Sequence, residues 1–346
     1  MNWGIAGHEW AVALLKEHIA RDQLRHAYLF TGPDGIGRRT IALRFAQALN
    51  CPQPLEPGEP CLTCPTCSKI ENMVHTDLTI VQSEGPGEML KVDQVRGLTR
   101  SLALSPYESK HRIALLLRFE GAHPSAANAL LKTLEEPSQH VVLILTADSV
   151  ENLLPTVVSR CEVMRLRPVA LEVLSRWLVG EMNIPPQDAK FYAHVSGGRP
   201  GIAIRLHTEP GLLKERGRYL DDLYQLLSSN RVGRFKYISS LIYPMDLQKT
   251  RVQIRERLFV WIALWRDVLF CAHGAQIPFV NQDQLERIID MAETFGYKSA
   301  HNTLNALQRT QNLLARNINP RLAAEWMMLR LPHGKIKTTV DDEVGN

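Results

Sequence analysis

The sequence has no apolar run long enough to span a bilayer, and its first residues carry no basic segment before an apolar stretch. These absences argue against a membrane-spanning or secreted protein, so we expect a cytoplasmic one. An excess of charge of one sign is also missing, because 40 Lys and Arg face 36 Asp and Glu, for a net charge of +4. This mild charge permits contact with nucleic acid without requiring strong binding by the chain alone.

Cysteine is scarce, with six in the chain, but four of the six are close together. Cys51 precedes a loop rich in Pro, Gly and Glu, and Cys61, Cys64 and Cys67 follow in two C-x-x-C steps. In a reducing compartment such a cluster indicates a metal rather than disulfides. Four thiolates suit a closed tetrahedral zinc site, which leaves no open position and is therefore structural. An iron–sulfur cluster is the main alternative, but no Cys-Pro follows at the ferredoxin spacing; free thiols are the third possibility.

A glycine-rich turn follows the first predicted strand, Ala27–Phe30. The turn leads into a predicted helix with Ile41, Phe45 and Leu49 on one face, and this layout is typical of a phosphate-binding loop. The glycine spacing fits the Walker pattern. The candidate loop comprises Gly32, Gly35, Gly37, Arg38, Arg39 and Thr40.

This loop lacks the two residues that act on a nucleotide. Arg38 and Arg39 stand where the Walker pattern has Lys followed by Ser or Thr, so the position after Arg38 offers no hydroxyl to Mg²⁺. Thr40 comes one residue late, about 100° further round the helix. The predicted strand Arg112–Leu117 also ends without the acid that would bind Mg²⁺, and Glu120 comes too late. We therefore expect negligible hydrolysis by this chain. Binding of ATP or ADP without hydrolysis stays open, as does a glycine turn that only packs a helix on a sheet.

Four other arginines are candidate phosphate ligands. Arg160, in a Ser-Arg-Cys triplet after the predicted strand Val141–Thr146, is expected just beyond the carboxyl edge of that strand, where α/β proteins do their chemistry. An intramolecular ion pair is its simpler role. Arg199 follows two glycines at a predicted helix start, although a plain turn explains the glycines equally well. Arg96 and Arg100 share a helix face, for which solvation is the simpler explanation.

The remaining sequence predicts helices. A small helical segment covers about 171–206, and only helices are expected over 211–331. One of them, at 258–269, is strongly apolar and should be buried in a bundle or at a subunit interface. Asn319 followed by Pro320 marks the start of a last helix. A length of 346 residues suits about two or three domains, and 45% hydrophobic residues with 22% charged ones are typical of a globular protein.

Together these motifs resemble the AAA+ clamp-loader subunits of bacterial DNA polymerase III, and the likeness covers almost the whole chain. It is carried by the glycine loop, the four-cysteine insert, the stretch from Asn128 to Pro137, the Ser159-Arg160-Cys161 triplet, Gly197 to Gly201, and the stretch from Asn319 to Ala323. The match is to a member of the family that does not hydrolyse ATP.

The resemblance implies an α/β fold: an AAA+ parallel-sheet domain over 1–166 with a zinc module at about 51–67, a helical lid over 167–210, an all-α collar over 211–331 and a flexible tail over 332–346. It implies partners, namely gamma- or tau-type ATPase subunits and a delta subunit, with the sliding clamp and primer-template DNA reached through the complex. It also implies that Arg160 acts on a neighbour's nucleotide. Two alternatives remain: an ATP-hydrolysing gamma- or tau-like motor, and a zinc-containing nucleic-acid-binding protein, which the scarcity of Lys and Arg between the cysteines disfavours.

Overall fold

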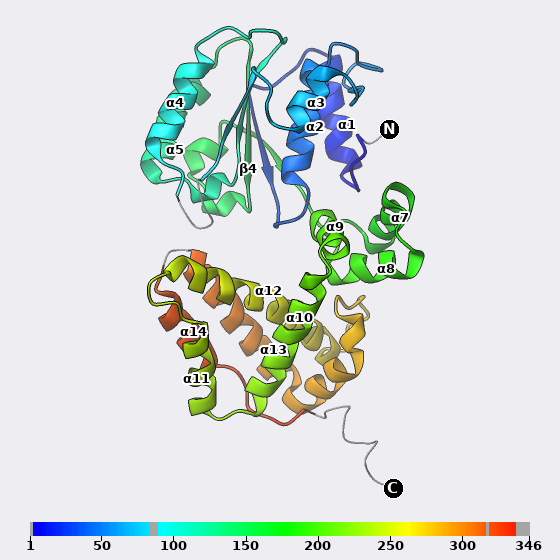
Figure 1. The fold of residues 1–346 in the computed structure, drawn as a ribbon, viewed down its shortest axis with the longest axis vertical. Coiled ribbons are helices and arrows are strands. Elements are labelled where there is room, and N and C mark those ends of the chain that lie inside the picture. Colours follow the sequence, from blue (N-terminus) through cyan, green and yellow to red (C-terminus); the bar gives the residue numbers. More distant parts are fainter. Residues whose placement is uncertain (1–2, 84–88, 316–317, 337–346) are drawn as a thin grey trace. The chain divides into compact units, whose positions relative to one another are not determined.

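A computed structural model describes residues 3–83, 89–315 and 318–336 (Figure 1). The chain divides into two compact units: Met1–Ala193 with Gly197–Ala203, and His194–Ser196 with Ile204–Asn346. Most of the predicted tail, 337–346, lies outside the described residues. None of the helices in the described ranges has the length and apolarity that a membrane span requires.

The first unit is built on a five-stranded parallel sheet. Its strands are β1 (Ala27–Thr31), β2 (Leu78–Val81), β3 (Arg112–Leu116), β4 (Val141–Ala147) and β5 (Glu162–Arg165). They lie in the order β2-β3-β4-β1-β5, which leaves β5 at one edge. Every residue of β1 and β4 is buried, as expected for continuous apolar runs in a sheet covered on both faces. The predicted α/β fold class is confirmed.

Helices cover both faces of this sheet (Figure 1). On one face, α1 (Glu9–Ala20) and α2 (Arg38–Asn50) enclose one core, with α3 (Pro65–Glu71) beside α2. On the other face, α4 (Val92–Leu102) and α5 (Pro124–Glu135) enclose a second core, with the short α6 (Pro155–Val158) next to α5. Both faces are therefore closed, and the ends of the strands are left to carry functional groups.

Three further helices follow β5, where the sequence predicts a small helical segment. They are α7 (Leu171–Met182), α8 (Pro186–Val195) and α9 (Pro200–Thr208). The start of α9 lies against the glycine turn, since the N–H of Gly201 donates to the carbonyl oxygen of Gly35 at 2.8 Å. This contact links the small helical segment to the candidate phosphate loop.

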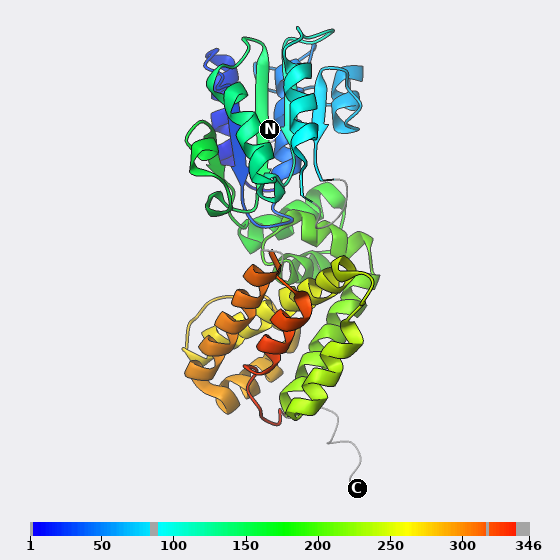
Figure 2. The ribbon, with the colours of Figure 1, turned by 90° about the vertical axis from the view of Figure 1, so that its left-hand side faces the viewer.

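The second unit is all helical, as predicted (Figure 2). Its main helices are α10 (Gly211–Ser228), α11 (Arg231–Leu241), α12 (Leu247–Ala272), α13 (Leu285–Ala315) and α14 (Pro320–Met328), and α13 is kinked at Gly296. Trp261 and Trp265 of α12 are almost fully buried, which confirms that this apolar helix lies inside a bundle. The predicted cap is also confirmed, because the Oδ1 of Asn319 accepts from the N–H of Arg321 at 2.9 Å.

A buried arginine in α11 holds the ends of two helices. All the donor nitrogens of Arg234 reach carbonyl oxygens: Nε donates to Leu226, Nη1 to Met328 and Leu331, and Nη2 to Leu227 and Pro332, at 2.6 to 3.5 Å. Those carbonyls lie in the last turn of α10, at the last residue of α14 and in the segment just after it; the carboxyl end of a helix leaves carbonyls without helical partners and favours a cation. Arg234 thus joins the end of α10 to the segment that ends α14, beside the backbone N–H groups of Ser229 and Gly334 that also donate to Leu226 and Leu227.

We predict that Arg234→Lys lowers the free energy of unfolding of the helical unit by about 2 to 4 kcal/mol. Lysine keeps the charge but cannot reach carbonyls in this fork geometry, so several of them lose their partners in a buried place. Urea denaturation followed by tryptophan fluorescence measures the effect. The matched control is Arg231→Lys, an exposed arginine in the same helix, which should change the free energy by less than about 0.5 kcal/mol. Equal midpoints for the two variants would contradict the prediction.

Candidate functional site

The glycine turn has the geometry of a phosphate loop. It leaves β1 at its carboxyl end and enters α2, and its three glycines have positive φ: 151° at Gly32, 76° at Gly35 and 107° at Gly37. A Cβ on Gly35 would lie 2.5 Å from the Cγ1 of Ile202 in α9, so this position requires glycine for packing as well as for conformation. The predicted strand–turn–helix is present.

The loop carries its own negative charge. The Oδ1 of Asp34 lies 3.7 Å from the Nη2 of Arg38 and 3.8 Å from the Nη2 of Arg118. Arg38 is only 8% exposed, and its Nη1 has no hydrogen-bond partner among the described residues. Arg39 donates instead to the Sδ of Met73 at 3.0 Å, and Thr40 is exposed. Sequence reasoning missed Asp34, because its interaction with Arg118 joins residues far apart in the chain.

The end of β3 supplies no carboxylate. After Leu117 the chain turns at Arg118, whose φ is 54° and whose N–H donates to the Oγ1 of Thr146 at 3.0 Å. Glu120 follows in a short 3-10 helix, where burial first, and then the nearby charge of Asp148, raise the pKa of its carboxyl. Both effects favour the neutral form of Glu120, so it differs from the ionised acid that a nucleotide-bound Mg²⁺ requires.

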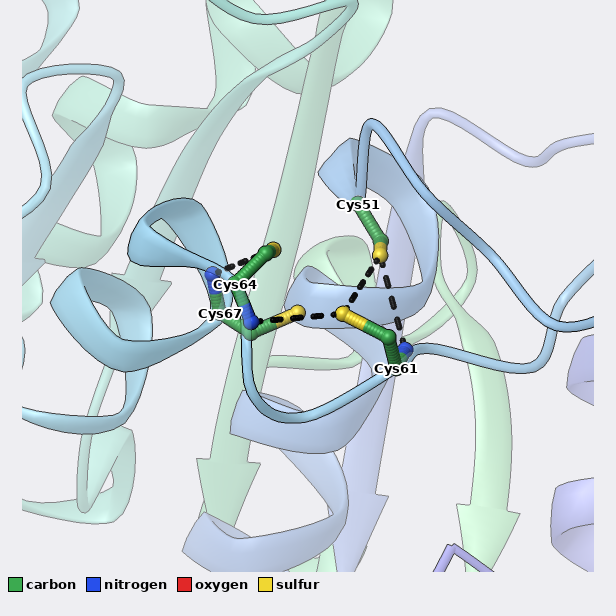
Figure 3. Close-up of side chains that lie close together, drawn as sticks. All are labelled: Cys51, Cys61, Cys64 and Cys67. Carbon is green, nitrogen blue, oxygen red and sulfur yellow. Dashed lines mark hydrogen bonds between the residues drawn. The ribbon is translucent and has the colours of Figure 1, made fainter.

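The four predicted cysteines converge at the other end of α2 (Figure 3). Their sulfur atoms all lie within 4.8 Å of one another. Cys51 ends α2 and Cys64 begins α3, whose first turn carries Cys67, so two helix ends position three of the thiols. The fourth thiol, that of Cys61, lies 3.5 Å from the Sγ of Cys51. The structure therefore brings the whole predicted ligand set together.

Backbone N–H groups surround these sulfurs. The N–H groups of Cys61, Cys64 and Cys67 point at the sulfurs of Cys51, Cys61 and Cys64 respectively, at 3.3 to 3.5 Å. Burial raises the pKa of Cys61, but N–H groups and neighbouring thiols outweigh it and lower that pKa to about 6, whereas burial raises the pKa of Cys67. Four thiolates this close repel one another unless a cation joins them. An all-sulfur tetrad with hydrogen-bonded sulfurs fits a metal ion that prefers soft ligands.

The structure corrects the expected position of Arg160. The triplet lies directly before β5, and β5 runs parallel to β1 with Glu162 opposite Tyr28. Arg160 therefore lies at the amino ends of the strands, and the expectation that it lies beyond the carboxyl end of β4 is wrong. The cause is the short α6, which returns the chain across the sheet between β4 and β5. The glycine loop follows Thr31, the last residue of β1, and so lies at the carboxyl ends of the strands.

Arg160 is ion-paired within its own chain. Its Nη2 lies 2.6 Å from the Oε1 of Glu135, the last residue of α5, and its Nη1 donates to the carbonyl oxygen of Thr156 at 2.9 Å. Even so, 34% of the Arg160 side chain and 50% of the Glu135 side chain remain exposed. The guanidinium is thus on the surface, where solvent weakens the ion pair.

The remaining candidate arginines are less distinctive. Arg199 directly precedes α9, two residues before the N–H that bonds to Gly35, so the chain brings it towards the glycine loop. Arg96 lies 3.6 Å from Asp93 on the same exposed helix face, and Arg100 is exposed one turn later. Their roles as phosphate ligands stay predictions.

Comparison with known families matches both units of the chain. The family described as DNA polymerase III, delta subunit, matches residues 7–170, which include the glycine loop, the four cysteines and Arg160. The family described as DNA polymerase III, delta subunit, C terminal, matches residues 245–333 in the helical unit.

Individual relatives agree with these matches. The DNA polymerase III subunit delta′ of Bacillus subtilis is 29% identical over 93% of this chain and 95% of its own length. The subunit delta′ of Pseudomonas aeruginosa is 35% identical over 64% of this chain and 67% of its own. Among solved structures, a gamma subunit-related protein of Thermotoga maritima aligns with 92% of this chain and 97% of its own at 18% identity and a TM-score of 0.43. Because the delta′ relatives and the two family matches cover both units, the chain belongs to the family of DNA polymerase III subunit delta′.

Proposed function

We propose that this delta′-type chain does not hydrolyse ATP itself and supplies Arg160 to the nucleotide of a neighbouring ATPase subunit in the clamp loader. The observation that carries the proposal is that Arg160 lies at the amino ends of the strands, whereas the glycine loop lies at their carboxyl ends. The guanidinium therefore cannot reach a nucleotide bound to its own glycine loop, but it could contact a nucleotide bound to a neighbouring subunit.

The contacts of Arg160 suit such a role. Its ion pair with Glu135 joins two partly exposed side chains, and pairs of this kind contribute only about 0 to 1 kcal/mol. A guanidinium that reaches a γ-phosphate in the transition state contributes about 10³ to 10⁵ in rate. Replacement of Glu135 by a phosphate as the partner of Arg160 would therefore lose little free energy and would give a large increase in the hydrolysis rate.

The proposed lack of ATP hydrolysis by this chain rests on the missing Mg²⁺ ligands and on the negative charge of Asp34. Phosphoryl transfer depends on positioning and on neutralisation of phosphate charge by Mg²⁺. Arg39 offers no hydroxyl to the metal, and Leu117 offers no carboxylate. Asp34 adds a negative charge beside the place of the phosphates and engages Arg38 and Arg118. We therefore infer that ATP or ADP binds here weakly, if it binds at all.

We infer that the metal of the thiolate cluster is zinc and that it is structural. Cys51, Cys61, Cys64 and Cys67 would hold it as four sulfur ligands, which leaves no position for a substrate. The ion would tie the end of α2 to the start of α3. A role of the cluster in reading nucleic acid has little support, since the basic residue beside it, Lys69, lies 3.3 Å from Glu108 and is thereby neutralised.

The family resemblance supports the rest of the assembly. In this proposal the partners are gamma- or tau-type ATPase subunits and a delta subunit in the cytoplasm. The sliding clamp and primer-template DNA are reached through the complex. We propose three domains along the chain: an AAA+ core at 1–166, a lid at 167–210 and a collar for oligomerisation at 211–331.

Reconstitution with a gamma-type ATPase and a delta subunit tests the role of Arg160. We expect Arg160→Ala to leave assembly intact and to reduce DNA-stimulated ATP hydrolysis, by about 10³-fold or more at the site that this chain completes. The matched control is Glu135→Gln, which breaks the same ion pair but keeps the guanidinium, and it should retain hydrolysis. Equal losses in the two variants would mean that the ion pair matters only for the fold.

The purified chain should show no Mg²⁺-dependent ATP hydrolysis, because the hydroxyl and the carboxylate that bind Mg²⁺ are both replaced. A phosphate-release assay with and without Mg²⁺ measures this directly. Turnover that Arg38→Ala abolishes would instead identify a gamma- or tau-like motor. Equilibrium binding of a labelled nucleotide to the same sample separates weak binding from none.

Elemental analysis of the purified chain should find one zinc ion for each chain. We expect Cys61→Ser to release the metal and to lower the thermal midpoint of the first unit by roughly 5 to 15 °C, since the metal's binding energy contributes to folding. The control is Cys271→Ser, a half-buried thiol of the helical unit, which should keep both the zinc and the midpoint. Iron at the site, or a full-length chain that folds without metal, would refute the assignment.

A further inference from the structure

A pocket of about 610 Å³ lies at the free edge of the sheet and serves none of the roles described above. It is lined by Trp10, Val163, Arg165 and Arg167. Trp10 belongs to the first turn of α1 and is 51% exposed. The other three residues alternate along β5 and its continuation, so they project from the same face of the edge strand.

The arginines of this pocket project away from the core beneath α1 and α2. Leu166, between them, is 3% exposed and packs in the core beneath α1 and α2, so Arg165 and Arg167 project from the opposite face of the strand. Both are exposed. The pocket is nevertheless close to the phosphate loop, because the N–H of Leu166 donates to the carbonyl oxygen of Thr31 at 2.7 Å, directly before Gly32.

The two arginines of the pocket form no ion pair within the described part of the chain. Within the described part of the chain, no carboxylate lies within 4.0 Å of the guanidinium of Arg165 or Arg167, and the lining contains no acid. Glu162, on the same strand, pairs with Arg25 instead, at 3.8 Å. Hydrogen bonds from its own backbone N–H and from Ser149, and then the charge of Arg165, lower the pKa of Glu151, so this carboxylate lies near Arg165 without forming an ion pair with it.

We propose that this pocket binds single-stranded nucleic acid, with a base stacked on Trp10 and neighbouring phosphates on Arg165 and Arg167. An exposed indole offers a flat face to any unpaired base, and Val163 extends the apolar wall. Two arginines in alternate positions of a strand lie about 6.6 Å apart along it, and each guanidinium can grip one phosphate of a chain with two hydrogen bonds. Paired bases would not be open to the indole, and an acidic peptide would leave the indole without a stacking partner.

The test uses the full-length chain alone and a fluorescein-labelled 15-mer of thymidine, with fluorescence anisotropy at several salt concentrations. We expect Trp10→Ala to weaken binding by roughly 5- to 100-fold and Trp10→Phe to keep most of it. Arg165→Ala with Arg167→Ala should weaken binding and reduce the salt slope by about 1.4, or about 0.7 for each lost phosphate contact. The matched control, Arg21→Ala with Arg176→Ala, removes the same charge from exposed sites of the same unit and should leave the slope unchanged.

Several outcomes would overturn the proposal. Equal effects of the two double variants would indicate attraction to the whole surface, and an unaffected Trp10→Ala would exclude stacking. Displacement of the oligonucleotide by ADP would identify a mononucleotide site, and equal displacement by oligoglutamate would identify a general anion patch. All the substituted side chains are exposed, so unchanged thermal midpoints exclude misfolding. Because no ATPase subunit is present and Arg160→Ala should bind normally, a failure here leaves the proposed role of Arg160 untouched.

Discussion

The parallel pairing of β1 with β5 is the structural constraint on which the proposed role of Arg160 depends. Because Tyr28 lies opposite Glu162, the residues before β5 are level with the start of β1, and the glycine loop begins where β1 ends. About six residues of extended strand, or about 20 Å, separate Arg160 from the loop. A rigid sheet cannot shorten this distance. In the proposed role of Arg160, the guanidinium and a phosphate loop can therefore meet only between two chains.

The glycine loop keeps its backbone shape for reasons that do not require a nucleotide. Gly35 is backed by Ile202 and accepts a hydrogen bond from Gly201, so a side chain there would disturb the packing of α9 whether or not phosphate is bound. Arg39, at the position of the hydroxyl that binds Mg²⁺ in the Walker pattern, is exposed and carries no such packing constraint. A loop of this kind can therefore lose the side chains that bind a nucleotide and still keep its backbone conformation. Here Asp34 supplies the negative charge beside Arg38.

The sequence is informative where one local signal is enough. Continuous buried runs predict β1 and β4, and the spacing of four cysteines predicts a cluster that the fold indeed assembles. The edge on which Arg160 lies could not be predicted, because it depends on the strand order and on the reversal through α6. The carbonyls bound by Arg234 likewise come from segments up to 98 residues away, and nothing near Arg234 in the sequence marks it as buried.

The ion pair between Arg160 and Glu135 appears at first to argue against a role in another subunit, but its energetics favour one. A long guanidinium side chain with no partner would sample many rotamers, and fixing it in a transition state would then cost about 2 kcal/mol of side-chain entropy. Glu135 and the carbonyl oxygen of Thr156 restrict the side chain beforehand. Because solvent screens the pair, the restraint remains weaker than the attraction of a γ-phosphate carrying several negative charges. The ion pair with Glu135 is thus compatible with the proposed role, because it orients the guanidinium and leaves it free to exchange the carboxylate for a phosphate.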